Sequence, residues 1–269
     1  MTELAAVDLT LQALKSNKIP LWQGRAAQAL FYHTLHRIHP FISETIHDLH
    51  KWQPIMPKPF TMSSLIGRRF EQDLLVIKRS EQLHLRWTTL HPDLTRVALN
   101  HVVPIWQREG ISIHDQRFWI RHTRIQRMHY NDLLESAGDS DCIVFEFHSP
   151  TAFKLTGGQY LAEPAPDYIF SSLFNRWNVF AADPLPADLL ETIQNRLRLT
   201  HSDTQQTTLR FARGRKGIIP GFTGRVEIAF NEPDRDLRRM LNALADYALF
   251  SGVGIKTTIG MGQAAIAQP

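Results

Sequence analysis

Hydrophobic positions in the first half of the chain follow two spacings. Short segments in which apolar residues are continuous or alternate with polar ones predict strands. These segments are Leu4–Leu14, Leu74–Arg79, His84–Thr89 and Phe118–Arg127. Apolar residues three or four positions apart predict helices that begin after Gly24, span Phe41–His50 and open at Pro92, since proline is favoured in a first helical turn.

The second half repeats the same order of patterns. The predicted strands are Cys142–His148, Thr208–Arg213, Arg225–Phe230 and the alternating tail Gln263–Gln268. The predicted helices are Tyr168–Phe180, Ala187–Leu199 and the long amphipathic segment Asp234–Phe250. The small, polar stretch Glu135–Asp141 between the two series is typical of a linker.

Each half therefore reads approximately as βαββαβ, which is the ferredoxin-like order. We expect an α+β fold made of two tandem ferredoxin-like (RRM-like) domains. The first would span residues 1–135 and carry the candidate catalytic residues. The second would span residues 141–269 and end in a glycine-rich loop.

Composition adds a preference for an anionic partner. The chain has 269 residues, of which 43% are hydrophobic, and Lys and Arg exceed Asp and Glu by four. Positive charge is concentrated, because no acid lies between Asp115 and Asp132 or between Asp203 and Glu227, although both tracts contain several arginines. Such tracts are often only solvated faces. Two of them beside a basic glycine loop favour nucleic acid.

Cysteine use and hydropathy point to the cytoplasm. Cys142 is the only cysteine, so an internal disulfide and a cysteine-based zinc site are excluded. No apolar run approaches the ~20 residues that cross a bilayer, and no charged-then-apolar leader opens the chain. We expect a soluble cytoplasmic protein without a membrane partner.

The most specific motif lies near the carboxy terminus. Gly252 and Gly254 are separated by five residues from Gly260 and Gly262, and Lys256 lies in the gap. Glycine allows positive φ and close approach of backbone to a ligand, so the motif suggests a loop whose N–H groups and lysine face a polyanion. The alternative is a helix C-cap followed by a glycine-rich turn.

This arrangement resembles the glycine-rich loop of the CRISPR-associated endoribonucleases that cut repeat RNA out of its precursor. These enzymes belong to the repeat-associated mysterious protein (RAMP) superfamily. Further segments resemble landmarks of that family in the family's order: Lys58–Ser63, Ser149–Lys154, Pro164–Pro166, Phe170–Asn178 and Gly221–Val226. The resemblance covers essentially the whole chain and implies the same tandem ferredoxin-like fold.

The resemblance also implies a set of catalytic residues. The family's nucleases commonly place a tyrosine on one helix, a histidine at the end of the next, and a lysine shortly before a Phe-Thr strand entry. Tyr32, His47 and Lys58 fit that order. His50 is the rival for the histidine, and it can share a helix face with His47. Without a catalytic role, Tyr32 would pack in the core and Lys58 would be a solvated lysine.

The chemistry needs no metal, because RNA carries its own nucleophile in the 2′-hydroxyl. Histidine suits proton transfer and lysine suits stabilisation of the charged phosphorane. A histidine cluster (His33, His36 and His39) is an alternative metal site, but no His-Glu-x-x-His motif accompanies it. We therefore predict no metal and no cofactor.

The implied activity is endonucleolytic cleavage within CRISPR repeats, giving 2′,3′-cyclic phosphate and 5′-hydroxyl ends. The predicted RNA-binding residues are Gly252, Gly254, Lys256, Gly260, Gly262, Arg210, Arg213, Arg215 and Lys216. Subunits of a CRISPR effector complex and a second copy of the chain are further candidate partners. The alternatives are a non-catalytic subunit that holds crRNA in an effector complex and a general single-strand RNA-binding protein.

Two further aromatic segments could pack in the core or contact RNA. Trp177 and Asn178, which follow Arg176, end an apolar helix, and core packing is their expected role. Phe222, between two glycines, could stack on a base or enter the core.

Overall fold

The computed structural model describes residues 3–52, 56–67, 69–210 and 217–267, with the side chains of residues 50–52 left aside. It divides into two units. Unit 1 comprises Met1–Arg127 with Thr258–Gly260, and unit 2 comprises Met128–Thr257 with Met261–Pro269. None of the described helices is both long and apolar enough to cross a membrane.

Unit 1 is built on a five-stranded sheet of order β3-β6-β1-β8-β7. Its strands are β1 (Leu4–Ala13), β3 (Phe60–Met62), β6 (Gln82–Thr89), β7 (Ile111–Ile113) and β8 (Gln116–Met128). The central strand β1 pairs antiparallel with β6, and Val7 lies opposite Trp87. A smaller sheet of order β2-β5-β4 contains β2 (Asn17–Pro20), β4 (Phe70–Glu71) and β5 (Leu74–Ile77).

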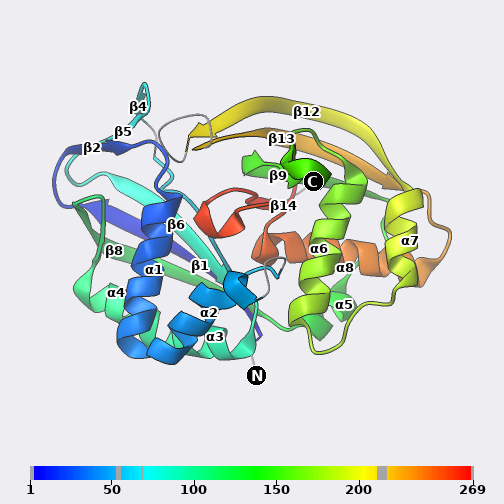
Figure 1. The fold of residues 1–269 in the computed structure, drawn as a ribbon, viewed down its shortest axis with the longest axis horizontal. Helices are drawn as coiled ribbons and strands as arrows, with labels where there is room; N and C mark the ends of the chain where they lie inside the picture. The colour runs from blue at the N-terminus through cyan, green and yellow to red at the C-terminus, as the bar shows by residue number, and fades with distance from the viewer. Residues whose placement is uncertain (1–2, 53–55, 68, 211–216, 268–269) are drawn as a thin grey trace. The chain divides into compact units, whose positions relative to one another are not determined.

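Helices cover the apolar face of this sheet (Figure 1). They are α1 (Gly24–Ile38), α2 (Pro40–Trp52), α3 (Pro92–Val97), a π-helical turn (Ala98–Val102) and α4 (Val103–Glu109). The core between helices and sheet is aromatic: Phe31, Trp87 and Trp106 are fully buried. Trp106 Nε1 donates to Thr34 Oγ1 at 2.9 Å, so its one polar atom is satisfied inside the core.

Unit 2 repeats the arrangement with a four-stranded sheet of order β12-β13-β9-β14. Its strands are β9 (Cys142–Thr151), β12 (Leu197–Arg210), β13 (Ile218–Phe230) and β14 (Ala264–Ile266). The helices are α5 (Tyr130–Ser136), α6 (Pro166–Phe180), α7 (Asp188–Asn195) and α8 (Arg235–Ser251). The remaining elements are the short strands β10 (Phe153–Lys154) and β11 (Tyr160–Leu161) and two 3₁₀ turns (Thr156–Gly158 and Thr257–Ile259).

In both units the first strand lies between the third and the fourth, and the second lies outside the third. This is the ferredoxin-like order, and the predicted α+β fold with two such units is confirmed. Helix α8 begins where Asp234 caps it, because the Asp234 carboxylate accepts from the backbone N–H of Asp236 and Leu237. Phe222 is buried and packs on Phe147 with ring centroids 4.9 Å apart, so it belongs to the core of unit 2.

Several predicted boundaries in unit 2 are wrong, among them the start of β13, which lies at Ile218 instead of Arg225. Helix α7 ends at Asn195 instead of continuing to Leu199, because Leu197 already pairs with Phe230 in the β12–β13 ladder. Strand β12 begins there instead of at Thr208. Most β12 side chains are exposed on both faces, so the strand has no buried face to impose an alternating pattern.

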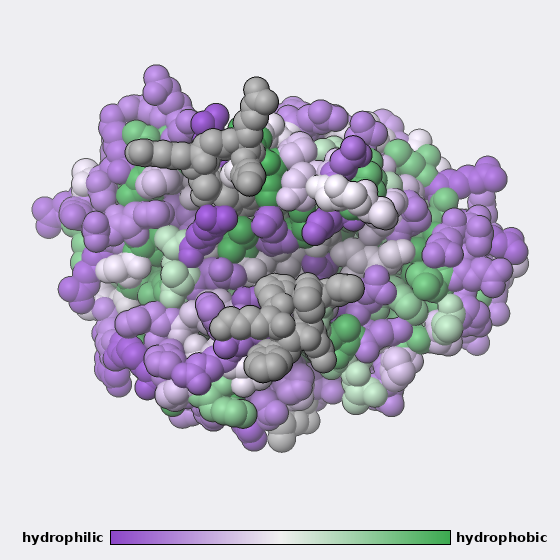
Figure 2. All heavy atoms as spheres, viewed as in Figure 1, coloured by the Kyte–Doolittle hydropathy of each residue, from purple (hydrophilic) through white to green (hydrophobic). Residues whose placement is uncertain are grey.

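The visible face of the molecule is mostly hydrophilic, and its hydrophobic residues form small separate patches (Figure 2). Large exposed apolar side chains in unit 1 include Phe41, Ile66, Phe70 and Trp119. Singly scattered apolar residues are normal on a protein surface. Trp119 differs because it lines a cavity, as described below.

Candidate active site and glycine-rich loop

Tyr32 and His47 lie on two consecutive helices of unit 1. Helix α1 ends at Ile38, and Pro40, whose fixed φ suits a first helical turn, begins α2. Ser43 Oγ donates to the carbonyl oxygen of Tyr32 at 3.3 Å and so joins the two helices. The rings of Tyr32 and His47 meet edge to face, with centroids 5.5 Å apart and planes at 78°.

Lys58 reaches the same place from the segment before β3. Pro59 follows it and restricts Lys58 to an extended conformation. Lys58 Nζ donates to Tyr32 Oη at 2.7 Å and lies 4.9 Å from the centroid of the Tyr32 ring. The structure thus brings three of the four predicted catalytic residues together, and we name Tyr32, His47 and Lys58 the Tyr32 cluster. The side chain of His50, the fourth, lies outside the described residues.

Burial sets the charge states of two members of the cluster. It lowers the pKa of the Lys58 ammonium, while the nearby negative charge of Asp48 acts in the opposite direction. It raises the pKa of the Tyr32 phenol, which therefore stays protonated at neutral pH. A phenol that accepts a hydrogen bond from lysine still has its own O–H to donate. The pair presents hydrogen-bond donors suited to an anionic oxygen.

His47 is the accessible member of the cluster, since its side chain is 66% exposed. Its Nδ1 lies 3.0 Å from Asp48 Oδ1. A carboxylate at Nδ1 fixes the orientation of an imidazole and directs Nε2 outward. The outward nitrogen can take a proton when the ring is neutral and give one when it is charged. The arrangement is therefore competent for general acid–base chemistry at a large substrate.

The glycine-rich loop (Gly252–Gly262) is mostly buried, with its backbone hydrogen-bonded to neighbouring protein groups. Four of its amides donate inside unit 2: Val253 N to Gly262 O at 2.8 Å, Gly254 N to Ser172 Oγ at 2.9 Å, Ile255 N to Ala152 O at 3.0 Å and Gly262 N to Pro150 O at 3.0 Å. These N–H groups hold the loop's own fold. RNA binding by its glycines stays a prediction.

Two of the glycines are required by the space around them. Gly254 has a φ of +77°, and a Cβ there would collide with the carbonyl oxygen of Ala152. Gly260 has a φ of +102°, and a Cβ there would lie 2.7 Å from Trp22 Cζ2 within unit 1. Trp22 Nε1 donates to the carbonyl oxygen of Ile259 at 3.0 Å in the same unit. Any side chain at these positions must displace neighbouring protein atoms.

Arg176 anchors the glycine-rich loop through hydrogen bonds from its side chain, and it was not among the functional residues predicted from the sequence. Its guanidinium donates to the carbonyl oxygens of Gly252 (3.1 Å) and Gly254 and to Ser172 Oγ (2.8 Å). The residue is only 9% exposed, and burial lowers its pKa to about 10. A signal was present in the sequence, because Arg176 lies on the apolar stripe of α6, three residues after Leu173. A buried arginine needs partners, and here they are the loop carbonyls.

The predicted basic residues are only partly covered by the structure. Lys256 is exposed and has a φ of +54°, which turns the loop at that point. Arg210 is exposed at the end of β12. Arg213, Arg215 and Lys216 lie outside the described residues.

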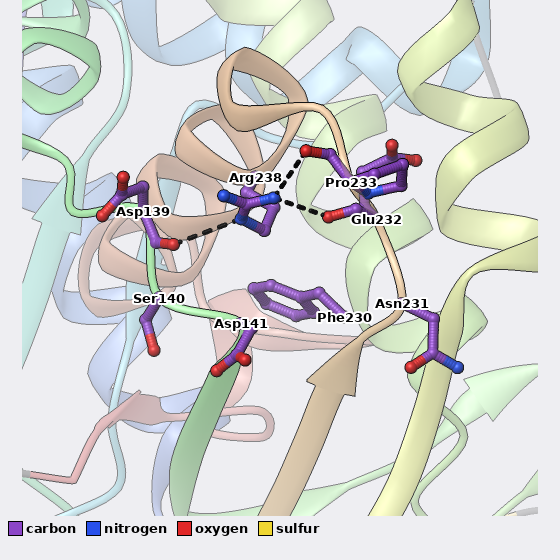
Figure 3. Close-up of a pocket in the computed structure, with 8 residues that line it drawn as sticks. All are labelled: Asp139, Ser140, Asp141, Phe230, Asn231, Glu232, Pro233 and Arg238. Atoms are coloured by element: carbon purple, nitrogen blue, oxygen red, sulfur yellow. Dashed lines mark hydrogen bonds between the residues drawn. The ribbon is translucent and has the colours of Figure 1, made fainter.

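Within the described part of the chain, neither a metal cluster nor the cavity in unit 2 offers another site for RNA chemistry. Among the described residues no group of three or more His, Cys, Asp or Glu side chains is placed to hold a metal ion. The cavity of about 590 Å³ in unit 2 is lined by Asp139, Asp141 and Glu232 and by one cation, Arg238. Arg238 donates to the carbonyl oxygens of Asp139, Glu232 and Pro233 (Figure 3). An acidic lining with its cation engaged does not suit a phosphate backbone.

The second half of the chain matches a known family. The model of the family described as CRISPR-associated endoribonuclease Cas6 matches residues 145–264. The chain is 26% identical over 164 residues to Cas6 of Streptococcus thermophilus, and the matched region covers 58% of this chain and 65% of that relative. It is 35% identical over 119 residues to Cas6 of Mycobacterium tuberculosis, and the matched region covers 44% of this chain and 36% of that relative. The match thus spans less than two thirds of these curated relatives.

The fold matches over a greater length. The solved structure of a Cas6 product complex is 25% identical to this chain and has a TM-score of 0.80, over 99% of this chain and 100% of that chain. The comparisons confirm the resemblance to CRISPR-associated endoribonucleases predicted from the sequence: the chain is similar to the Cas6 endoribonucleases in fold over nearly its whole length and in sequence over residues 145–264.

Proposed function

We propose that this protein is a metal-independent endoribonuclease that cuts CRISPR precursor RNA within its repeats. The observation that carries the proposal is the Tyr32 cluster, in which Lys58 Nζ donates to Tyr32 Oη at 2.7 Å beside the exposed His47 ring. The similarity to Cas6 endoribonucleases supports the substrate class. One Cas6 protein of similar fold was solved as a product complex.

In the proposed reaction the 2′-hydroxyl oxygen attacks the adjacent phosphorus and the bond to the 5′-oxygen breaks. His47 takes the 2′ proton or gives a proton to the leaving oxygen, through the ring nitrogen that faces away from Asp48. Lys58, positioned by Tyr32, stabilises the charge that develops on the phosphorane oxygens. The products carry a 2′,3′-cyclic phosphate and a 5′-hydroxyl.

The arrangement supports a division of labour between the two units. The glycine-rich loop, with Lys256 and the basic tract that begins at Arg210, would hold the RNA backbone. Arg176 would keep the loop in shape without touching RNA, since its guanidinium is buried against the loop carbonyls.

The decisive experiment uses a repeat transcribed from the CRISPR array nearest to the coding sequence. We expect cutting to proceed in excess EDTA, because the nucleophile is internal and the proposed groups need no metal. The same RNA with one 2′-deoxy nucleotide upstream of the cut should bind with unchanged affinity and stay intact. Loss of cutting in EDTA, or cutting of the deoxy substrate, would contradict the mechanism.

The second candidate is a crRNA-binding subunit without catalysis. The high exposure of His47, with 66% of its side chain open to solvent, is the observation that favours it, since catalytic groups are usually more enclosed. The same cleavage assay separates the two functions. A binding subunit would retain repeat RNA and leave it uncut under every condition.

A further inference from the structure

Unit 1 contains a polar cavity of about 390 Å³, formed by α1, α4, β7 and β8. It includes no member of the Tyr32 cluster, although His33 on its wall is the next residue along α1 from Tyr32. The charged and aromatic residues that line it are His33, Arg37, Trp106, Arg108, Glu109, Arg117 and Trp119.

The cavity carries more positive charge than its acid can balance. Arg37 Nη1 lies 3.3 Å from Glu109 Oε2, and Arg108 Nη2 lies 2.8 Å from Glu109 Oε1. Arg117 Nη2 donates to the backbone carbonyl of Glu109 at 3.3 Å. One carboxylate therefore serves two guanidinium groups, and a third is held by a neutral carbonyl. Each guanidinium has five N–H donors, so the set retains capacity for an anion.

An indole ring lies among these cations. Trp119 is 38% exposed, and the guanidinium carbon of Arg117 lies 5.5 Å from the centroid of its ring. Gly110, which ends α4 with a φ of +70°, supports the ring: a Cβ there would lie 3.1 Å from Trp119 Cε3. The indole is thus held against the backbone while part of its surface faces solvent. Indole and guanidinium planes are the surfaces on which unpaired RNA bases stack.

We infer that this cavity binds a single-stranded segment of RNA, with a base stacked on Trp119 and the adjoining phosphates on Arg37, Arg108 and Arg117. The inference rests on the proposed function, because it takes RNA to be the ligand. It adds a contact for RNA beyond the Tyr32 cluster and the glycine-rich loop. An acidic peptide would use the arginines but would leave the indole without a role, so the indole decides in favour of RNA.

The test uses the full chain and a 15-nucleotide oligouridylate with a fluorescein label. Fluorescence anisotropy at several salt concentrations should show that Trp119→Ala weakens binding by about 5- to 100-fold, the usual worth of one stacked base. Trp119→Phe should keep most of the affinity. Arg117→Ala should weaken binding and reduce the salt dependence by about one phosphate. Phe70→Ala, an exposed aromatic of unit 1, and Arg96→Ala, an exposed arginine, are the matched controls.

Other basic surfaces also bind oligouridylate, so a second measurement reports the position. Oligouridylate with one 5-iodouridine should crosslink to Trp119 on irradiation, as mapped by mass spectrometry. Crosslinks only to other residues, or unchanged affinity in Trp119→Ala and Arg117→Ala, would overturn the inference. Inorganic polyphosphate, which has no bases, should bind wild type and Trp119→Ala equally. An equal loss for polyphosphate would show a damaged cavity and reject stacking.

Cleavage of the repeat RNA by the same preparations separates the two proposals. If the wild type cuts the repeat while Trp119 has no effect on oligouridylate, this inference fails and the proposed function stands. If the wild type neither binds nor cuts RNA, both fail together.

Discussion

The Tyr32 cluster and the glycine-rich loop are built in opposite ways. The cluster consists of side chains that touch one another at the surface of unit 1, and His47 is two-thirds exposed. The loop consists mainly of buried backbone, whose carbonyl oxygens accept hydrogen bonds from Arg176. Replacement of the exposed His47 side chain should disturb the packing little, whereas replacement of Arg176 removes hydrogen bonds from buried loop carbonyls. We therefore expect changes in the cluster to alter rates and changes around the loop to alter stability or binding.

The largest effect should come from His47→Ala. Removal of a general acid or base usually costs about 10²- to 10⁴-fold in rate. Single-turnover cleavage of repeat RNA should slow by that factor, while RNA affinity and the melting temperature stay close to wild type because the side chain is exposed.

His50→Ala is the matched control, since it lies on the same helix. A large loss in His50→Ala with a small one in His47→Ala would reverse the assignment between the two. Full activity in both variants would favour the crRNA-binding alternative.

The opposite behaviour is expected for Arg176→Met. This substitution leaves the carbonyl oxygen of Gly254 buried without its arginine donor, whereas the carbonyl oxygen of Gly252 still accepts from Ser251 Oγ. An unsatisfied buried acceptor costs about 1–3 kcal/mol, and relief of the guanidinium's own desolvation offsets part of that cost. Urea denaturation should show the free energy of unfolding of unit 2 lowered by about 1–2 kcal/mol.

Arg96→Met serves as the reference for Arg176→Met, because Arg96 is exposed and forms a surface ion pair with Asp93. It should change stability by less than about 0.5 kcal/mol. Equal stability of Arg176→Met and wild type would mean that the guanidinium does not support the loop.

The pH dependence of cutting should sharpen the picture of the cluster. Lysine is charged below its pKa, and burial lowers the pKa of Lys58. The cutting rate should therefore fall at high pH, and the fall should begin below the ordinary lysine pKa of ~10.4. Lys58→Arg keeps its charge at all these values and should remove that alkaline limb, even if its maximal rate is lower.

Asp48→Asn tests the alkaline limb of the pH–rate profile by changing the pKa of Lys58 in the opposite direction. The negative charge of Asp48 raises the pKa of Lys58, so its removal should move the alkaline limb to lower pH. A pH–rate profile identical in wild type, Lys58→Arg and Asp48→Asn would exclude Lys58 from the reaction.

Sequence could predict what depends on local pattern. The predicted bounds of strand β1 and helix α8 differ from the structure by one residue at most, because polar and apolar residues alternate in the second half of β1 and Asp234 caps the start of α8. Most of strand β12 was not predicted, because both of its faces are largely exposed and its sequence therefore shows no alternation of apolar and polar residues. The order of Tyr32, His47 and Lys58 came from a family resemblance, and the contact between Lys58 and Tyr32 joins residues far apart in the sequence.

The contacts of Arg176 and Trp119 could not be predicted from the sequence pattern. An arginine on an apolar stripe indicates that partners exist, but only the fold shows that they are the carbonyls of Gly252 and Gly254. Trp119 alternates with Phe118 along β8 as an outward residue would. Its place beside Gly110 and Arg117 depends on how α4 meets the edge strand, which no spacing rule encodes.

The smallest effect, and the one that tests the loop as a binding element, should come from Lys256→Ala. Lys256 is exposed at a turn of the loop, so its removal costs the fold little. If its ammonium contacts one phosphate, RNA affinity should fall and the slope of log affinity against log salt should decrease by about one phosphate. Lys15→Ala, another exposed lysine, should leave both unchanged. Gly260→Val should weaken binding at every salt concentration, because its side chain would press on Trp22 and distort the loop. Unchanged affinity in Lys256→Ala and Gly260→Val, with circular dichroism like wild type, would make the loop a connection from helix to strand and leave RNA recognition to the basic tract and the arginines of unit 1.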